Sequence, residues 1–156
     1  MTVIRNGPYQ PMVGDPDDYR PRTLWRVVVD DASDGREPAD GAFLFESCAV
    51  GDRIPVHRHD VDEIVAVVEG SAEYRLGADS HAVGPGDVVF IPAGTAHGTV
   101  NTGDVPLLIH AVFPRVRVRI EMLERNPAPG TEDAPPMTTV YDFRSGAVVV
   151  EGPSGR

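Results

Sequence analysis

Two stretches of the chain decide its fold: Gly51-Asp-Arg-Ile-Pro-Val-His57-Arg-His59-Asp-Val-Asp-Glu63-Ile-Val-Ala-Val-Val-Glu-Gly70 and Gly86-Asp-Val-Val-Phe-Ile-Pro92-Ala-Gly94-Thr-Ala-His97-Gly-Thr-Val-Asn101. Side chains alternate across a strand, so His57 and His59 share one face if their segment is extended. Any one of these histidines alone would more often be an ordinary surface or core residue. Together with a carboxylate they form a ligand set that suits first-row divalent metals. We therefore predict a metal site inside a barrel, built from His57, His59, Glu63 and His97.

The composition limits the class of protein and its partners. A chain of 156 residues is long enough for one domain with a substantial core. The formal charge of −10 argues against nucleic acid or an anionic membrane as a partner, because both need a basic surface. All 14 basic residues are arginine, which excludes lysine Schiff-base chemistry and a P-loop lysine.

The expected location is the cytoplasm. No apolar run approaches the length that crosses a bilayer, and the polar start of the chain is not a secretory signal. The single cysteine, Cys48, excludes an intrachain disulfide and fits a reducing compartment. We expect its thiol to be buried and inert.

Short apolar runs between Gly- and Pro-rich turns predict an all-β fold, a sandwich or a barrel. The predicted strands are Trp25–Val29, Phe43–Val50, Glu63–Val68, Ala72–Leu76, Val88–Ile91, Ala96–Val100, Leu107–Phe113 and Val116–Leu123. We expect an N-terminal arm over residues 1–22, the barrel over 23–123 and a C-terminal extension over 124–156. Within the extension, Tyr141–Phe143 and Ala147–Val150 are expected to form a late strand or hairpin.

The two stretches resemble the sequence motifs of the cupin superfamily. The first motif, G-x5-H-x-H-x3,4-E-x6-G, is matched at Gly51, His57, His59, Glu63 and Gly70, and the second, G-x5-P-x-G-x2-H-x3-N, at Gly86, Pro92, Gly94, His97 and Asn101. The chain is similar to small single-domain members of the cupin type 2 family, in the RmlC-like jelly-roll superfamily. The resemblance implies a double-stranded β-helix, the cupin jelly-roll barrel. It also implies one divalent metal ion (Fe, Mn, Ni or Zn) on His57, His59, Glu63 and His97, and a homodimer, as many relatives exchange terminal strands.

Five further residues are predicted to line a substrate pocket: His110, Tyr74, Phe90, Val65 and Thr99. Val65 shares a strand face with Glu63, and Thr99 shares one with His97. For His110 the alternative is a partly exposed histidine, and for both aromatic residues it is core filling. Arg115, Arg117 and Arg119 form a basic stripe that we interpret as a solvated strand face, with an anionic substrate or a dimer contact as the alternative.

Three functions follow from these patterns. The first is a metal-dependent enzyme acting on a small molecule, with dioxygenase-type oxidation as the leading subclass, as the resemblance implies. Four protein ligands on an octahedral metal leave two positions for substrate or dioxygen, and Glu63 would also accept a proton, as proposed for some relatives. The alternatives are a non-oxidative isomerase, lyase, decarboxylase or aromatic polyketide cyclase, and a protein that binds or senses a small ligand without turnover.

Overall fold

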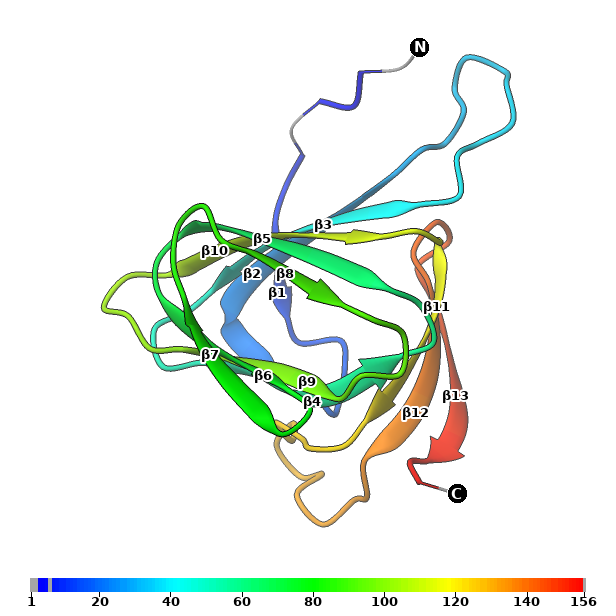
Figure 1. Cartoon of the computed structure of the whole chain (residues 1–156). Helices are drawn as coiled ribbons and strands as arrows, with labels where there is room; N and C mark the ends of the chain where they lie inside the picture. The colour runs from blue at the N-terminus through cyan, green and yellow to red at the C-terminus, as the bar shows by residue number, and fades with distance from the viewer. Residues whose placement is uncertain (1–2, 6, 156) are drawn as a thin grey trace.

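The fold consists of two antiparallel β-sheets facing one another, seen in a computed structural model that describes residues 3–5 and 7–155 (Figure 1). Thirteen strands make up the sheets, and the described part of the chain contains no helix. Accordingly, no helix in that part is long and apolar enough to cross a membrane. The prediction of an all-β jelly-roll barrel is confirmed.

The first sheet has six strands in the order β1-β2-β3-β10-β5-β8. Their bounds are β1 Gln10–Met12, β2 Arg20–Val29, β3 Ala42–Cys48, β10 Leu107–Phe113, β5 Glu63–Glu69 and β8 Val88–Ile91. The second sheet has seven strands in the order β13-β12-β11-β4-β9-β6-β7. Their bounds are β13 Ala147–Pro153, β12 Met137–Asp142, β11 Arg117–Met122, β4 Arg53–His59, β9 His97–Asn101, β6 Ala72–Leu76 and β7 Asp79–Val83.

Alternation along the strands builds the core between the sheets. In β10, Leu107, Ile109, Ala111 and Phe113 are all at most 4% exposed, while the residues between them face outward. Tyr74 of β6 and Val118 of β11 meet this core from the other sheet. The inner faces of the two sheets thus pack together and form the hydrophobic core.

Strands near both ends of the chain pair with the barrel sheets. β1 pairs with β2, and the predicted boundary between arm and barrel at residue 22 falls inside β2. In the extension, β12 and β13 form a hairpin that continues the seven-stranded sheet beyond β11 (Figure 1). The two ends also contact each other, because Asp17 accepts hydrogen bonds from the Arg125 side chain and from the Met137 backbone N–H.

Candidate metal centre and cavity

Three histidines converge from neighbouring strands of the seven-stranded sheet. His57 and His59 are two residues apart on β4, so both face the barrel interior. His97 begins β9, where it pairs in register with His57, after an irregularity in the ladder between Ile54 and His57. Side chains of directly opposite residues lie on the same face. The ring nitrogens of the three histidines offer ligand atoms within 4.8 Å of one another.

Backbone carbonyl groups hold two of these rings in place. Nδ1 of His57 lies 2.7 Å from the Pro55 carbonyl oxygen, and Nδ1 of His97 lies 2.8 Å from the Thr95 carbonyl oxygen. Since a carbonyl only accepts, each Nδ1 carries the proton and donates it, which leaves Nε2 with a free lone pair. This is the arrangement in which outer hydrogen bonds orient metal-binding histidines.

Glu63 reaches the same point from the opposite sheet, at the start of β5. Its Oε2 lies 3.3 Å from Nε2 of His97 and 3.6 Å from Nδ1 of His59. Both of those ring nitrogens are buried and have no hydrogen-bond partner. Buried polar atoms without a partner are costly, and a bound cation would satisfy them together. The donor set therefore fits a divalent metal ion.

The electrostatics favour the neutral form of His57 and His59. Burial, with a smaller contribution from His97, lowers the pKa of His57 to about 3. Burial also lowers the pKa of His59 well below its usual value. Metal binding requires deprotonated imidazole, so protons compete weakly for these two rings near neutral pH.

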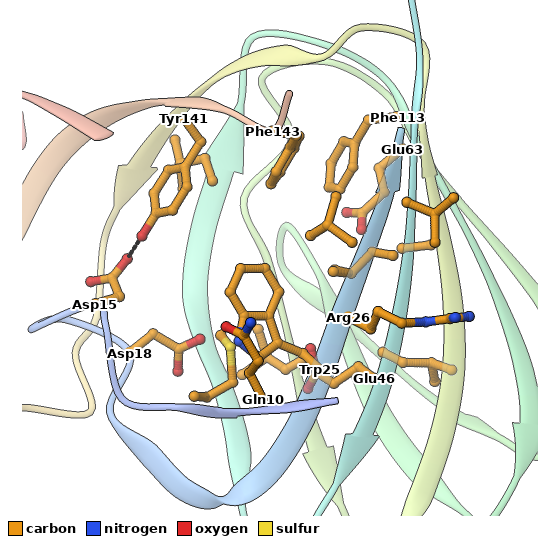
Figure 2. Close-up of a pocket in the computed structure, with 18 of the residues that line it drawn as sticks. Gln10, Asp15, Asp18, Trp25, Arg26, Glu46, Glu63, Phe113, Tyr141 and Phe143 are labelled. Carbon is orange, nitrogen blue, oxygen red and sulfur yellow. Dashed lines mark hydrogen bonds between the residues drawn. The ribbon is translucent and has the colours of Figure 1, made fainter. Parts of the chain in front are cut away.

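The cluster opens into a cavity of about 890 Å³ that runs between the two sheets. Figure 2 shows residues that line it. Apolar side chains from both sheets form much of its wall, among them Val65, Ile109, Ile120 and Met122. A cavity of this size is within the range that holds a small organic molecule.

A buried ion cluster lies in the wall of the cavity. The Arg20 guanidinium, 3% exposed, donates two hydrogen bonds of 2.7 Å to Asp18 and a further one to Glu46. Burial raises the pKa of Glu46, although Arg20 opposes this shift. Sequence reasoning missed this cluster because Arg20 falls in the segment interpreted as an arm. The alternation of Glu46 with Cys48 on a buried face was the available signal.

A row of aromatic side chains continues from His59 along the wall of the cavity. Ring centroids lie 5.1 Å apart for His59 and Phe113, 5.5 Å for Phe113 and Phe143, and 6.1 Å for Phe143 and Tyr141. The Tyr141 hydroxyl then donates a hydrogen bond to Asp15 (Figure 2). We call Phe113, Phe143 and Tyr141 the aromatic row.

The structure places the predicted pocket residues on both sides of the barrel wall. Val65, Tyr74 and Thr99 line the cavity, as does Glu63. His110 and Phe90 do not, and their assignment to the pocket is corrected. They alternate with the inward-facing Ile109 and Ile91, so both point outward.

The outward surroundings of these two residues account for them. Phe90 is 56% exposed. His110 packs edge-on against Phe45 and Phe43, with ring centroids 4.6 Å and 5.8 Å away. Neither residue faces the histidine cluster, which leaves the alternative interpretation of His110 as a partly exposed histidine.

The fold is thus a β-barrel whose cavity is lined by a cluster of three histidines, a candidate metal site. A sequence model described as a cupin domain matches residues 44–113. The chain therefore carries a cupin-type domain, as the two motifs predicted.

The chain is similar to several known proteins over parts of its length. It is 29% identical over 89 residues to auxin-binding protein 1 of Arabidopsis thaliana, covering 51% of this chain and 44% of that protein. It is 40% identical over 55 residues to the dimethylsulfoniopropionate lyase DddQ of Ruegeria pomeroyi, covering 35% of this chain and 27% of that protein. The chain thus spans less than half the length of these curated relatives.

Among solved structures, a cupin-superfamily sugar phosphate isomerase from Silicibacter pomeroyi is similar, with a TM-score of 0.57. Sequence identity is 22%, and the match covers 83% of this chain and 79% of that one. At this identity the likeness concerns the fold. The structural match covers more of this chain than residues 44–113, the segment that matches the cupin domain.

Proposed function

We propose that this chain is a metal-dependent enzyme acting on a small organic molecule in the barrel cavity, with dioxygenase-type oxidation as its leading reaction. One observation carries the proposal: His57, His59 and His97 converge at the inner end of a cavity, with Glu63 opposite them. A divalent metal held there would polarise a substrate oxygen or lower the pKa of a bound water.

The chain's own residues supply the surroundings that such chemistry needs. Val65, Ile109 and Met122 give the cavity an apolar wall, which strengthens electrostatic interactions next to it. Glu63 is buried beside two imidazoles and is the group we expect to accept a proton from substrate. Thr99, 3% exposed, offers a hydroxyl for substrate orientation.

The metal content of the purified protein tests the first part of this proposal. We expect about one divalent ion per chain in the wild type and a loss of bound metal in His57→Ala and Glu63→Gln. His81→Ala is the matched control, because His81 is an exposed histidine outside the cavity. Equal metal content in His57→Ala and the wild type would contradict the proposal.

Non-oxidative chemistry, as in an isomerase, lyase, decarboxylase or polyketide cyclase, is the second candidate. The Tyr74 hydroxyl supports it, because this group is 2% exposed in the cavity wall, and burial, with Glu63 and Glu46, raises its pKa. A phenol that stays protonated is suited to donate a hydrogen bond to an enolate or carbonyl oxygen. One curated relative is named a lyase, and another is named a binding protein, which keeps ligand binding without turnover as a third candidate.

Oxygen consumption separates these candidates. The iron(II)-loaded and zinc-loaded proteins are screened against one library of phenols, enols and sugar acids with an oxygen electrode and mass spectrometry. Turnover with oxygen uptake only in the iron form supports oxidation. Turnover by the zinc form without oxygen uptake supports non-oxidative chemistry, and a ligand that binds unchanged supports a binding protein.

We also propose that the chain forms a homodimer. Support comes from the outer face of the six-stranded sheet, where Phe43, Ile64, Val88 and Phe90 are between 37% and 63% exposed. Apolar area of this kind is common at protein interfaces. Light scattering after gel filtration tests this, and a monomer at all concentrations would contradict it. The cytoplasmic location and the lack of nucleic-acid or membrane partners stay predictions.

A further inference from the structure

Aromatic side chains line the cavity on two sides. On one side lies the aromatic row, in which Phe113 and Phe143 stack with an interplanar angle of 30° and Tyr141 is tilted by 35° to Phe143. From β2, Trp25 projects into the same cavity, and Figure 2 shows its indole across the open space from Phe143. Trp25 pairs in register with the buried Glu46 and so shares its inward face.

The charged side chains around this region disfavour a ligand whose ring system carries a negative charge. Asp18, Glu46 and Glu63 face the cavity, and the buried cation among them, Arg20, is already paired with the first two. Arg26 also lines the cavity, but its guanidinium lies over the Phe45 ring, 4.3 Å from the ring centroid. A carboxylate placed beside Asp18, Glu46 and Glu63 would therefore meet like charges.

Resting on the proposed function, we propose that the substrate class is a flat, uncharged aromatic molecule that carries a hydroxyl or carbonyl oxygen. Its ring system lies between Trp25 and the aromatic row, and its oxygen points toward His57, His59 and His97. Aromatic rings gain from offset or edge contacts with one another beyond the apolar area that they bury. A puckered saturated ring of the same carbon skeleton loses those contacts.

Three of the four aromatic residues that would contact the ligand lie outside the segment that matches the cupin domain. The matched cupin domain covers residues 44–113 and includes the histidine cluster and, at its last residue, Phe113. Trp25 lies before this segment, and Tyr141 and Phe143 lie after it. The domain core therefore supplies the metal ligands, whereas the flanking segments supply the preference for an aromatic ligand.

A pair of ligands tests this proposal without any substitution. Calorimetry compares 2-naphthol with its saturated analogue decahydro-2-naphthol on the wild-type protein, in metal-free and zinc-loaded forms. We expect 2-naphthol to bind at least tenfold more tightly, and more tightly than 2-naphthoate in the metal-free form. Trp25 is the sole tryptophan, so its indole N–H gives one NMR signal, which we expect to shift with 2-naphthol.

Matched variants locate the contact. Phe143→Leu keeps an apolar side chain but removes a ring, and we expect it to weaken 2-naphthol binding about tenfold, or about 1.4 kcal/mol, with little effect on decahydro-2-naphthol. Phe90→Leu removes an exposed ring on the outer sheet face and should change neither affinity.

Equal affinity for the two ligands, or an unchanged Trp25 signal, would overturn the inference. Failure of zinc to bind, with the 2-naphthol preference intact, would instead contradict the metal site and leave the aromatic site standing. Zinc binding without the 2-naphthol preference would contradict the aromatic site alone.

Discussion

His57 and His59 are buried imidazoles whose pKa values lie below the usual value of 6.5, so we expect the metal-free protein to lose stability in acid. The unfolded chain takes up protons on these rings as the pH falls below about 6.5, whereas folded His57 does so only near pH 3. Their contribution to stability is therefore present above pH 6.5 and is lost as the pH falls toward 3. The expected slope is roughly 1.4 kcal/mol per pH unit for each ring.

Urea unfolding of the metal-free protein between pH 7.5 and 5 measures this slope. His57→Asn should flatten the pH dependence, while His81→Asn, at an exposed position, should leave it as in the wild type. An equally steep dependence in His57→Asn would show that other groups are responsible.

Residue types and spacings sufficed to predict the histidine cluster, because the motif fixes both identity and strand face. The direction of His110 was harder to predict, since Leu107–Phe113 is apolar on both faces and its alternation gives no inward side. Cys48 is fully buried, which confirms the first part of the expectation for this residue, and burial raises the pKa of its thiol to about 11. Its lack of reactivity stays a prediction.

At the level of elements, Gly70 directly follows β5 and has a conformation that other residues rarely adopt, with φ at 88°. A Cβ atom there would lie 2.9 Å from the Pro106 carbonyl oxygen. We expect Gly70→Ala to lower the free energy of unfolding by about 2–4 kcal/mol, through backbone strain and the clash together.

Gly77 provides the control for this substitution. It also has a positive φ, 60°, but a Cβ atom would meet no heavy atom within 4 Å. Gly77→Ala should therefore cost only about 1 kcal/mol. Equal losses in the two variants, measured by urea unfolding, would contradict the role assigned to the contact with Pro106.

The junction between the ends of the chain depends on a buried ion pair. Asp17 is 2% exposed and accepts hydrogen bonds from Arg125 and from the Met137 N–H, so its removal leaves the buried Arg125 guanidinium without its carboxylate partner. We expect Asp17→Ala to cost about 3–5 kcal/mol. Glu151→Ala breaks an exposed pair with Arg119 and should cost less than about 1 kcal/mol.

Thermal unfolding of both variants measures the difference. Similar melting temperatures for Asp17→Ala and the wild type would contradict the role of the junction. The sequence did not predict this contact, because the pair joins residues more than 100 positions apart and carries no local signal.

Most elements follow from local patterns, and the exceptions have local causes. The predicted strands 72–76, 88–91 and 107–113 match β6, β8 and β10 at both ends. β7 was missed because its start, Asp79-Ser80, falls in a cluster of turn residues. β2 begins five residues before the predicted start at Trp25, since Arg20 and Arg22 conceal the strand pattern.

At the scale of the whole molecule, we expect bound metal to stabilise the fold. A ligand that binds only the folded state at about 1,000 times its Kd contributes about 4 kcal/mol. For a chain of this size that corresponds to a rise in Tm of roughly 10 °C. The measurement is differential scanning calorimetry of the protein with excess zinc and after treatment with a chelator.

His97→Gln should abolish the response of Tm to zinc, because it removes one of the three converging rings. His81→Gln should retain the full response. A rise in Tm of the same size in both variants would assign the effect to a different zinc site.

The whole cavity was less predictable than the metal ligands at its inner end. Its wall combines Trp25, Glu46 and Phe143, which come from separate parts of the chain and meet only through sheet pairing. Periodicity indicates which face of a strand is buried, but it does not indicate which distant segment covers that face.

The contact between the two ends of the chain also bears on how the protein is made. During synthesis the segment with His57, His59 and His97 leaves the ribosome well before Arg125 and Tyr141 exist to meet Asp17 and Asp15. Domains begin to fold from the N-terminal side as they emerge. We therefore expect a nascent barrel that holds its histidines together while the cavity is still open on one side, and that closes only as the last thirty or so residues arrive.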